Sequence, residues 1–275
     1  MAHDHLERIA RWLLAVVAAL GAVACAGGTP LLHPAHTLPA GKTRFAAGLS
    51  GNFASGNAAS AIDSAQAQQP TGAVDRPPPA YVRGALAVAA FAPGVVPFVS
   101  GRVGLGSDAE AGLTYTGHVL RIDGRYAISG EHTALSFGIG GSALMSRRGG
   151  VAVSQLGGLD LQGVSGWGAD IPIVFGWRSS GDVLWWWGGV RGAYESLHGD
   201  VGLVLPSPQD AVSGSLEARR TMAGALTGFA IGFRHLHAAV EFQGAWHDAS
   251  GTLWGTDAKV TGLTWTPAAA LLGTF

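Results

Sequence analysis

The sequence is poor in charge, has no long apolar run and contains a single cysteine. Only 13% of its 275 residues are charged and the formal net charge is −1, so nothing in the charge balance predicts nucleic-acid binding. The longest apolar run, residues 12–24, falls short of the roughly 20 residues that a membrane-spanning helix needs. No transmembrane helix is therefore predicted.

The single cysteine, Cys25, excludes any intramolecular disulfide. It follows an apolar run that is preceded by Arg8 and Arg11, which is the order of regions in an export signal. We therefore interpret residues 1–24 as a signal peptide and expect the exported chain to begin near Cys25.

The segment Ala22-Val23-Ala24-Cys25 resembles a bacterial lipobox. The resemblance implies cleavage before Cys25, lipidation of its thiol and an acyl anchor, whose burial contributes about 0.8 kcal/mol per CH₂. Ala22 stands where such motifs commonly have leucine, so ordinary signal-peptidase cleavage nearby is the alternative. Ala26 is not acidic and so lacks the usual signal for inner-membrane retention. Residues 25–42, which contain three prolines and no period, are predicted to be a lipidated periplasmic tether.

What the chain has in abundance is apolar residues and glycine. Hydrophobic residues make up 48% of it, 43 residues are glycine and the mean hydropathy is +0.27. In Leu236–His247, apolar side chains such as Val240 alternate with polar ones such as Glu241, so one face of a strand suits lipid and the other water. In lipid, only a closed barrel satisfies the backbone of every strand.

Residues 43–275 are therefore predicted to form an all-β antiparallel transmembrane β-barrel with both termini in the periplasm. The predicted count is ten strands, with 12 as the fallback. The predicted strands are 43–54, 95–106, 109–117, 118–128, 132–145, 165–178, 182–197, 219–233, 236–247 and 259–275.

An even number of strands places tight turns at the periplasmic end and longer loops at the extracellular end. The predicted turns are Ser107–Asp108, Ser129–Glu131, Ser179–Gly181 and Arg234–His235. The predicted extracellular loops are 55–94, 146–164, 198–218 and 248–258, with a short one at Gly117. Residues 80–94 can be read as a strand, a short helix or a plug, and we assign them to the first loop.

The last predicted strand ends in an aromatic residue, Phe275. Such an ending is typical of bacterial outer-membrane barrels, so Phe275 is predicted to act as the assembly signal for the barrel-assembly machinery. Segments 36–43 and 104–113 are similar to segments of uncharacterised outer-membrane β-barrel proteins of Gram-negative bacteria, and the resemblance covers most of the exported chain. The resemblance implies a location in that membrane and contact with its lipid, and it implies no residue-level activity.

If the alternation holds, a set of mostly charged side chains faces the barrel interior. In this set six arginines face four carboxylates, together with one histidine. Its members are Arg44, Arg102, Arg121, Asp123, Arg125, Asp170, Arg178, Arg191, Glu195, His237 and Glu241. The diameter of a barrel grows with the number of strands, and eight strands leave room only for side chains. A ten-stranded barrel is therefore narrow, and we expect an ion network that largely fills its interior.

This interior predicts a structural or interaction role, with the extracellular loops contacting envelope proteins. The alternative is a narrow channel, anion-preferring or solute-specific, lined by the excess arginine. In Trp185-Trp186-Trp187 the outer two residues are expected to point inward and Trp186 to face lipid.

The sequence predicts no catalytic residue, metal site or cofactor. A ten-stranded barrel resembles the omptin proteases, and His247-Asp248 is expected at the extracellular rim, but no matching pair of acids stands on the opposite strands. Ser142 and His132 lie too far apart on one strand to act as a pair. The spacing of His235 and His237 suits a metal, yet no third ligand is evident.

Overall fold

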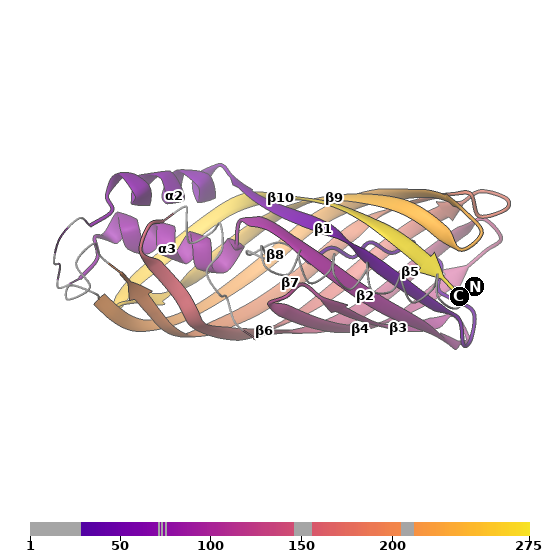
Figure 1. The fold of residues 1–275 in the computed structure, drawn as a ribbon, viewed down its shortest axis with the longest axis horizontal. Helices are drawn as coiled ribbons and strands as arrows, with labels where there is room; N and C mark the ends of the chain where they lie inside the picture. The colour runs from indigo at the N-terminus through magenta and orange to yellow at the C-terminus, as the bar shows by residue number, and fades with distance from the viewer. Residues whose placement is uncertain (1–28, 71, 73, 75, 146–155, 205–211) are drawn as a thin grey trace, which may run out of the picture.

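The computed structural model describes residues 29–70, 72, 74, 76–145, 156–204 and 212–275. Within them, ten antiparallel strands close into one barrel, each paired with its neighbours in sequence and β1 paired with β10 (Figure 1). The strands are β1 (Thr43–Ser55), β2 (Gly94–Gly106), β3 (Ala109–Tyr115), β4 (Val119–Ser129), β5 (Thr133–Leu144), β6 (Leu159–Arg178), β7 (Leu184–Leu203), β8 (Val212–Phe233), β9 (Leu236–Leu253) and β10 (Thr256–Thr274). The predicted ten-stranded all-β fold is confirmed.

Over most of their length the strands carry apolar side chains outside and polar ones inside. On β9, Leu236 and Phe242 are about half exposed whereas His237 and Glu241 are buried. Because successive side chains of a strand point to opposite faces, one period-two pattern produces both surfaces. Trp185 and Trp187 are buried and Trp186 is exposed, which confirms the predicted orientation of the three tryptophans.

The end of the barrel that holds both β1's start and β10's end is closed by tight turns. The β2–β3 turn has Ser107 and Asp108 at φ 50° and 59°, the left-handed backbone that two-residue hairpin turns require. The backbones of Thr43 and Phe275 exchange hydrogen bonds at this end. We refer to it as the periplasmic end, as the even strand count predicts.

At the opposite end, β6 to β10 extend further than predicted. Parts of the predicted loops 198–218 and 248–258 are strand. Loop 248–258 shrinks to a turn at Trp254 and Gly255. The prediction was wrong there because it followed outward apolar residues, and these stop while backbone pairing continues. In the extension the pattern inverts: outward His198 and Glu217 are exposed, and inward leucines are buried.

Two helices come from the first loop: α3 (Pro79–Phe91) fills the extended end of the barrel, and α2 (Asn57–Ala67) packs over α3 with one face and leaves the other exposed (Figure 1). Ten residues of α3 are buried, and they pack against inward residues of β6 to β10 such as Leu216 and Leu253. Residues 80–94 are therefore mainly a helical plug. No helix of the described residues is both long enough and apolar enough to cross a membrane.

The N-terminal segment, residues 29–42, differs most from its prediction. Instead of forming a periplasmic tether, residues 30–36 are buried inside the barrel. The sequence pattern missed this because the segment has no period and its contacts are made largely by its backbone. Cys25 and the predicted signal peptide, residues 1–24, lie outside the described residues.

We expect Gly84→Ala to loosen the helical plug while the barrel stays closed. A Cβ at Gly84 would lie 2.2 Å from the Ala65 Cβ and 2.8 Å from the Ala61 carbonyl oxygen, so α2 and α3 must separate at a cost of about 1–3 kcal/mol. Hydrogen exchange should rise in both helices and stay unchanged in β1 to β5. Gly72→Ala is the control, because nothing lies within 4 Å of its added Cβ. Equal exchange in the two variants would contradict the close packing.

Candidate functional site

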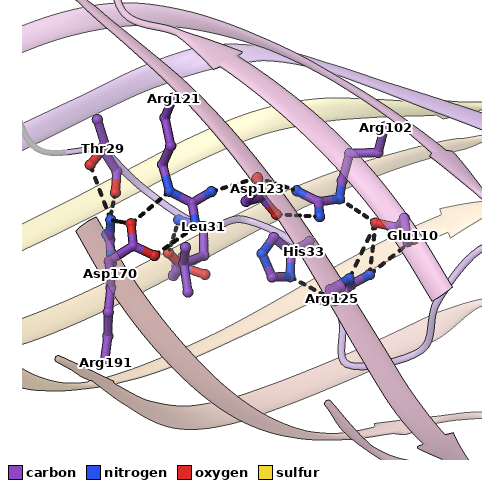
Figure 2. A network of polar contacts seen from close by, with 11 residues as sticks. Thr29, Leu31, His33, Arg102, Glu110, Arg121, Asp123, Arg125, Asp170 and Arg191 are labelled. Atoms are coloured by element: carbon purple, nitrogen blue, oxygen red, sulfur yellow. Dashed lines mark hydrogen bonds and ion pairs between the residues drawn. The ribbon is translucent and has the colours of Figure 1, made fainter. Parts of the chain in front are cut away.

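A chain of buried ion pairs crosses the inside of the barrel wall (Figure 2). Arg121 lies between two carboxylates, 2.6 Å from Asp123 and 2.8 Å from Asp170. Asp170 also pairs with Arg191 at 2.7 Å, and Asp123 with Arg102 at 2.6 Å. All five side chains are no more than 6% exposed. We call this chain, extended below to Glu110 and Arg125, the lumen network.

Glycines on the neighbouring strands make room for the guanidinium groups. Gly112 is the register partner of both Arg102 and Asp123, and a Cβ on it would lie 2.5 Å from Arg102 Nη1. Gly140 on β5 stands opposite Asp170, and its Cβ would lie 2.6 Å from Arg121 Nη2. The inward glycines therefore let large charged side chains lie flat against the wall.

Arg125 and Glu110 extend the network to the N-terminal segment. They pair with each other at 3.0 Å, and Arg102 donates to Glu110 as well. Arg125 also donates to the carbonyl oxygens of Pro34 at 2.6 Å and His36 at 3.1 Å. Backbone carbonyls of the segment thus satisfy donors that the three acids of the network leave free.

Glu241 binds the same segment with the opposite polarity. Its two carboxylate oxygens accept the backbone N–H groups of Leu31 and Leu32, each at 2.9 Å, and the indole N–H of Trp187 at 2.9 Å. Leu32 has φ 42°, and consecutive N–H groups at such a left-handed residue form a concavity for an anion. A buried carboxylate is therefore satisfied by main chain and indole, without an arginine.

The segment is held at its two ends as well as in its middle. The Thr29 carbonyl oxygen accepts from Arg191 at 2.8 Å, and the Leu38 N–H donates to Glu110 at 2.9 Å. Charged side chains from four different strands therefore bind residues 29–38 along the lumen, and we call these residues the N-terminal plug.

From the other side, helix α3 ends against polar side chains of the wall. Arg220 pairs with Glu195 at 2.5 Å and donates to the Ala90 carbonyl at 2.6 Å, while Asn52 donates to the Phe91 carbonyl. The last carbonyls of a helix lack intrahelical partners and carry partial negative charge. A cation and an amide therefore satisfy the end of α3 inside the barrel.

Two small cavities separate the N-terminal plug from α3. They have volumes of about 70 and 40 Å³, and both are bordered by Thr29, Asn52, Arg191 and Arg220. Each has room for a few water molecules. Among the described residues, the N-terminal plug therefore fills the lumen from the periplasmic side and α3 fills it from the other.

The predicted interior residues divide into three groups by position. Arg102, Arg121, Asp123, Arg125, Asp170, Arg191 and Glu241 lie in the network or bind the plug. Glu195 lies beside α3, paired with Arg220. Arg44, Arg178 and His237 lie near the periplasmic end, where Arg178 is 39% exposed and 3.7 Å from Asp182, and His237 stacks on Trp185.

Two important inward side chains, Glu110 and Arg220, were missing from the predicted interior. Glu110 shares its face of β3 with Gly112 and Thr114, a run of small residues that gave little sign of alternation. Arg220 lies next to the predicted loop 198–218, where the strand boundary was misplaced. Both lie inside the predicted strands 109–117 and 219–233, so the alternation applied through each whole strand would have found both.

His247 and Asp248, which were expected at the extracellular rim, lie on opposite faces of β9. His247 is buried, contacts Thr264 Oγ1 at 2.7 Å and lies against Phe91, whereas Asp248 faces outward and pairs with Lys259 at 2.8 Å. Consecutive strand residues point to opposite faces, so the two cannot act together. Within the described ranges, no group of three or more His, Cys, Asp or Glu is placed to hold a metal.

An exposed serine–histidine pair lies on the outer surface of the extended end. Ser165 Oγ lies 3.2 Å from His198 Nε2, and Glu217 is the register partner of His198 on β8. Within the described residues, no hydrogen bond connects Glu217 to the imidazole, so the orienting third group of a triad is missing. The pair does not by itself indicate catalysis.

No protein-family model matches the chain, and no curated protein matches it. It is similar to solved outer-membrane proteins at low identity. Neisserial surface protein A is 8% identical, covering 85% of this chain and 96% of that one, with a TM-score of 0.34. The outer membrane protease OmpT from Escherichia coli is 8% identical over 86% and 97%, with a TM-score of 0.38. OprG from Pseudomonas aeruginosa is 7% identical over 87% and 98%, with a TM-score of 0.34.

We expect Asp170→Asn to destabilise the barrel by about 3–5 kcal/mol, because it leaves Arg121 and Arg191 buried beside a neutral group. Urea unfolding of the refolded barrel in detergent measures the change. Asp248→Asn removes the same charge from an exposed pair and should cost no more than about 1 kcal/mol. Similar losses in the two variants would show that the network does not determine stability.

Proposed function

We propose that the protein is an outer-membrane β-barrel with a closed lumen, which has a structural or interaction role in the cell envelope. The observation that carries this proposal is the binding of the N-terminal plug by Glu110, Arg125, Arg191 and Glu241. A diffusion pore requires a continuous water path, and here the plug and α3 fill the lumen from opposite ends.

The outer surface supports the membrane location. Apolar side chains cover the outside of the barrel over most of its length, and aromatic residues border this band. At one edge Trp167 lies 5.6 Å from Tyr194 between ring centroids, and at the other Phe175 and Trp186 lie 6.2 Å apart. Such a band with aromatic borders is the lipid-facing surface of an outer-membrane barrel, and the export signal expected at residues 1–24 agrees with it.

The extended end supports the interaction role. Beyond the aromatic border the outward residues of β6 to β10 are polar, and the buried ones form an apolar core with α2 and α3. This end is built like a soluble protein, so it projects from the membrane as a rigid surface available to envelope proteins. At the other end, the strand that ends at Phe275 serves the barrel-assembly machinery.

A second function is favoured by the arginines that hold the plug. Arg125 and Arg191 donate to plug carbonyls, and withdrawal of the plug would expose these cations to water. The barrel would then be a gated, anion-preferring path, which is closed in the arrangement described above.

We expect Ile171→Arg to destabilise the barrel by about 2–4 kcal/mol if β6 crosses lipid at this position. Ile171 is 59% exposed and lies midway between the border residues Trp167 and Phe175 of β6. Unfolding of the barrel refolded into phospholipid vesicles measures this. Ser215→Arg, on the polar outer surface of the extended end, should change stability by less than about 0.5 kcal/mol. A neutral Ile171→Arg would place the apolar band outside lipid.

We expect the wild-type barrel to be silent in a planar bilayer and Glu241→Ala to show intermittent openings. The substitution removes the acceptor of the Leu31 and Leu32 N–H groups, and the opened lumen should prefer anions because its arginines remain. Glu217→Ala removes a carboxylate from the outer surface and should stay silent. Steady conductance of the wild type would contradict the closed lumen, and cation preference of the openings would contradict the second function.

A further inference from the structure

Arg44 is a lumen arginine that lies outside the network. It lies on β1 near the periplasmic end and is only 7% exposed. Its Nε donates to Thr274 Oγ1 at 3.3 Å and its guanidinium lies 5.1 Å from the ring centre of Trp185. Its Nη1 has no hydrogen-bond partner, and no carboxylate of the described residues pairs with it. A buried cation without an anion destabilises a protein by several kcal/mol. An anionic ligand beside Arg44 would remove this cost.

Arg44 borders a cavity of about 230 Å³ at the periplasmic end of the barrel. Four cationic side chains line this cavity, namely Lys42, Arg44, Arg178 and Arg234, against the acidic side chain of Asp182 and the carboxylate of Phe275. Asp182 is about half exposed and is 3.7 Å from Arg178. The cavity therefore carries an excess of positive charge that the side chains of the described residues do not neutralise.

Two more buried nitrogen atoms at this cavity lack partners. His36 Nε2 and Trp185 Nε1 are both buried without a hydrogen bond, and both residues line the same cavity as Arg44. An indole N–H can only donate, and an unsatisfied buried donor costs about 1–3 kcal/mol. Three unpartnered nitrogen atoms of different side chains thus surround one cationic cavity.

We propose that this cavity binds a phosphate oxyanion, either free phosphate or the headgroup phosphate of a phospholipid. Four cations and several free donors exceed what these two carboxylates, each with a single charge and two oxygens, can satisfy. A phosphate has more acceptor oxygens and more charge, and the planar guanidinium of Arg44 can bind it through two parallel bonds. The proposal goes beyond the closed barrel, because it gives the periplasmic end a ligand of its own.

Inorganic phosphate and phosphatidylglycerol are the two probes for the test. Phosphate binding to the full refolded barrel in detergent is measured by calorimetry, and phosphatidylglycerol that remains bound after detergent washing by native mass spectrometry. We expect Arg44→Gln to weaken phosphate binding, or to lower lipid retention, by about tenfold or more, since a charged hydrogen bond contributes about 1.5–3 kcal/mol. The matched control Arg219→Gln, on the exposed outer face of β8, should stay within about twofold of the wild type.

The arms of the test separate the possible outcomes. Phosphate binding in detergent supports a soluble ligand, and lipid retention without phosphate binding supports a headgroup. Absence of both in the wild type overturns the proposal, as does equal binding by the wild type and Arg44→Gln. Should Arg44→Gln fail to fold, Arg178→Gln and Trp185→Phe replace it. Each should weaken binding severalfold, and wild-type affinity in both would overturn the proposal.

Discussion

The interior of the barrel within the apolar band follows from the need to pair charge in a narrow space that lipid surrounds. The wall alternates apolar and polar residues, so its polar side chains must meet one another or the N-terminal plug. Arg102, Arg121 and Arg191 pair with carboxylates that lie one or two strands away. Arg125 finds part of its acceptors in plug carbonyls and Glu241 finds donors in plug N–H groups. The plug is therefore as much a part of the electrostatic structure as the strands are.

The change of pattern along each long strand divides the molecule into two parts. In the apolar band, water is absent outside and polar groups gather inside. In the extended end the outer surface is polar, so the interior can be apolar and is filled by α3 and leucines of β6 to β10. One continuous sheet can serve both parts because strand pairing depends on the backbone, while the side chains follow their surroundings.

The sequence was sufficient for the barrel and insufficient for its contents. Strands such as Leu236–Leu253 begin with a clear period, and an even count with tight turns fixed the order of elements. The inward position of Arg121, Asp170 and Glu241 follows from that period alone. The N-terminal plug has no such signal, because Leu31 and Leu32 bind through their backbone N–H groups. Only the position of Glu241 in three dimensions shows that a segment 209 residues away in sequence completes it.

The N-terminal plug satisfies charges of both signs because it does so through its backbone. Glu241 accepts the N–H groups of Leu31 and Leu32, whereas Arg125 and Arg191 donate to the carbonyl oxygens of Pro34 and Thr29. An irregular segment has both kinds of group free, since none is used in a helix or a sheet. Withdrawal of the plug would leave Arg125, Arg191 and Glu241 without these partners, so the charges of the wall themselves favour the filled lumen.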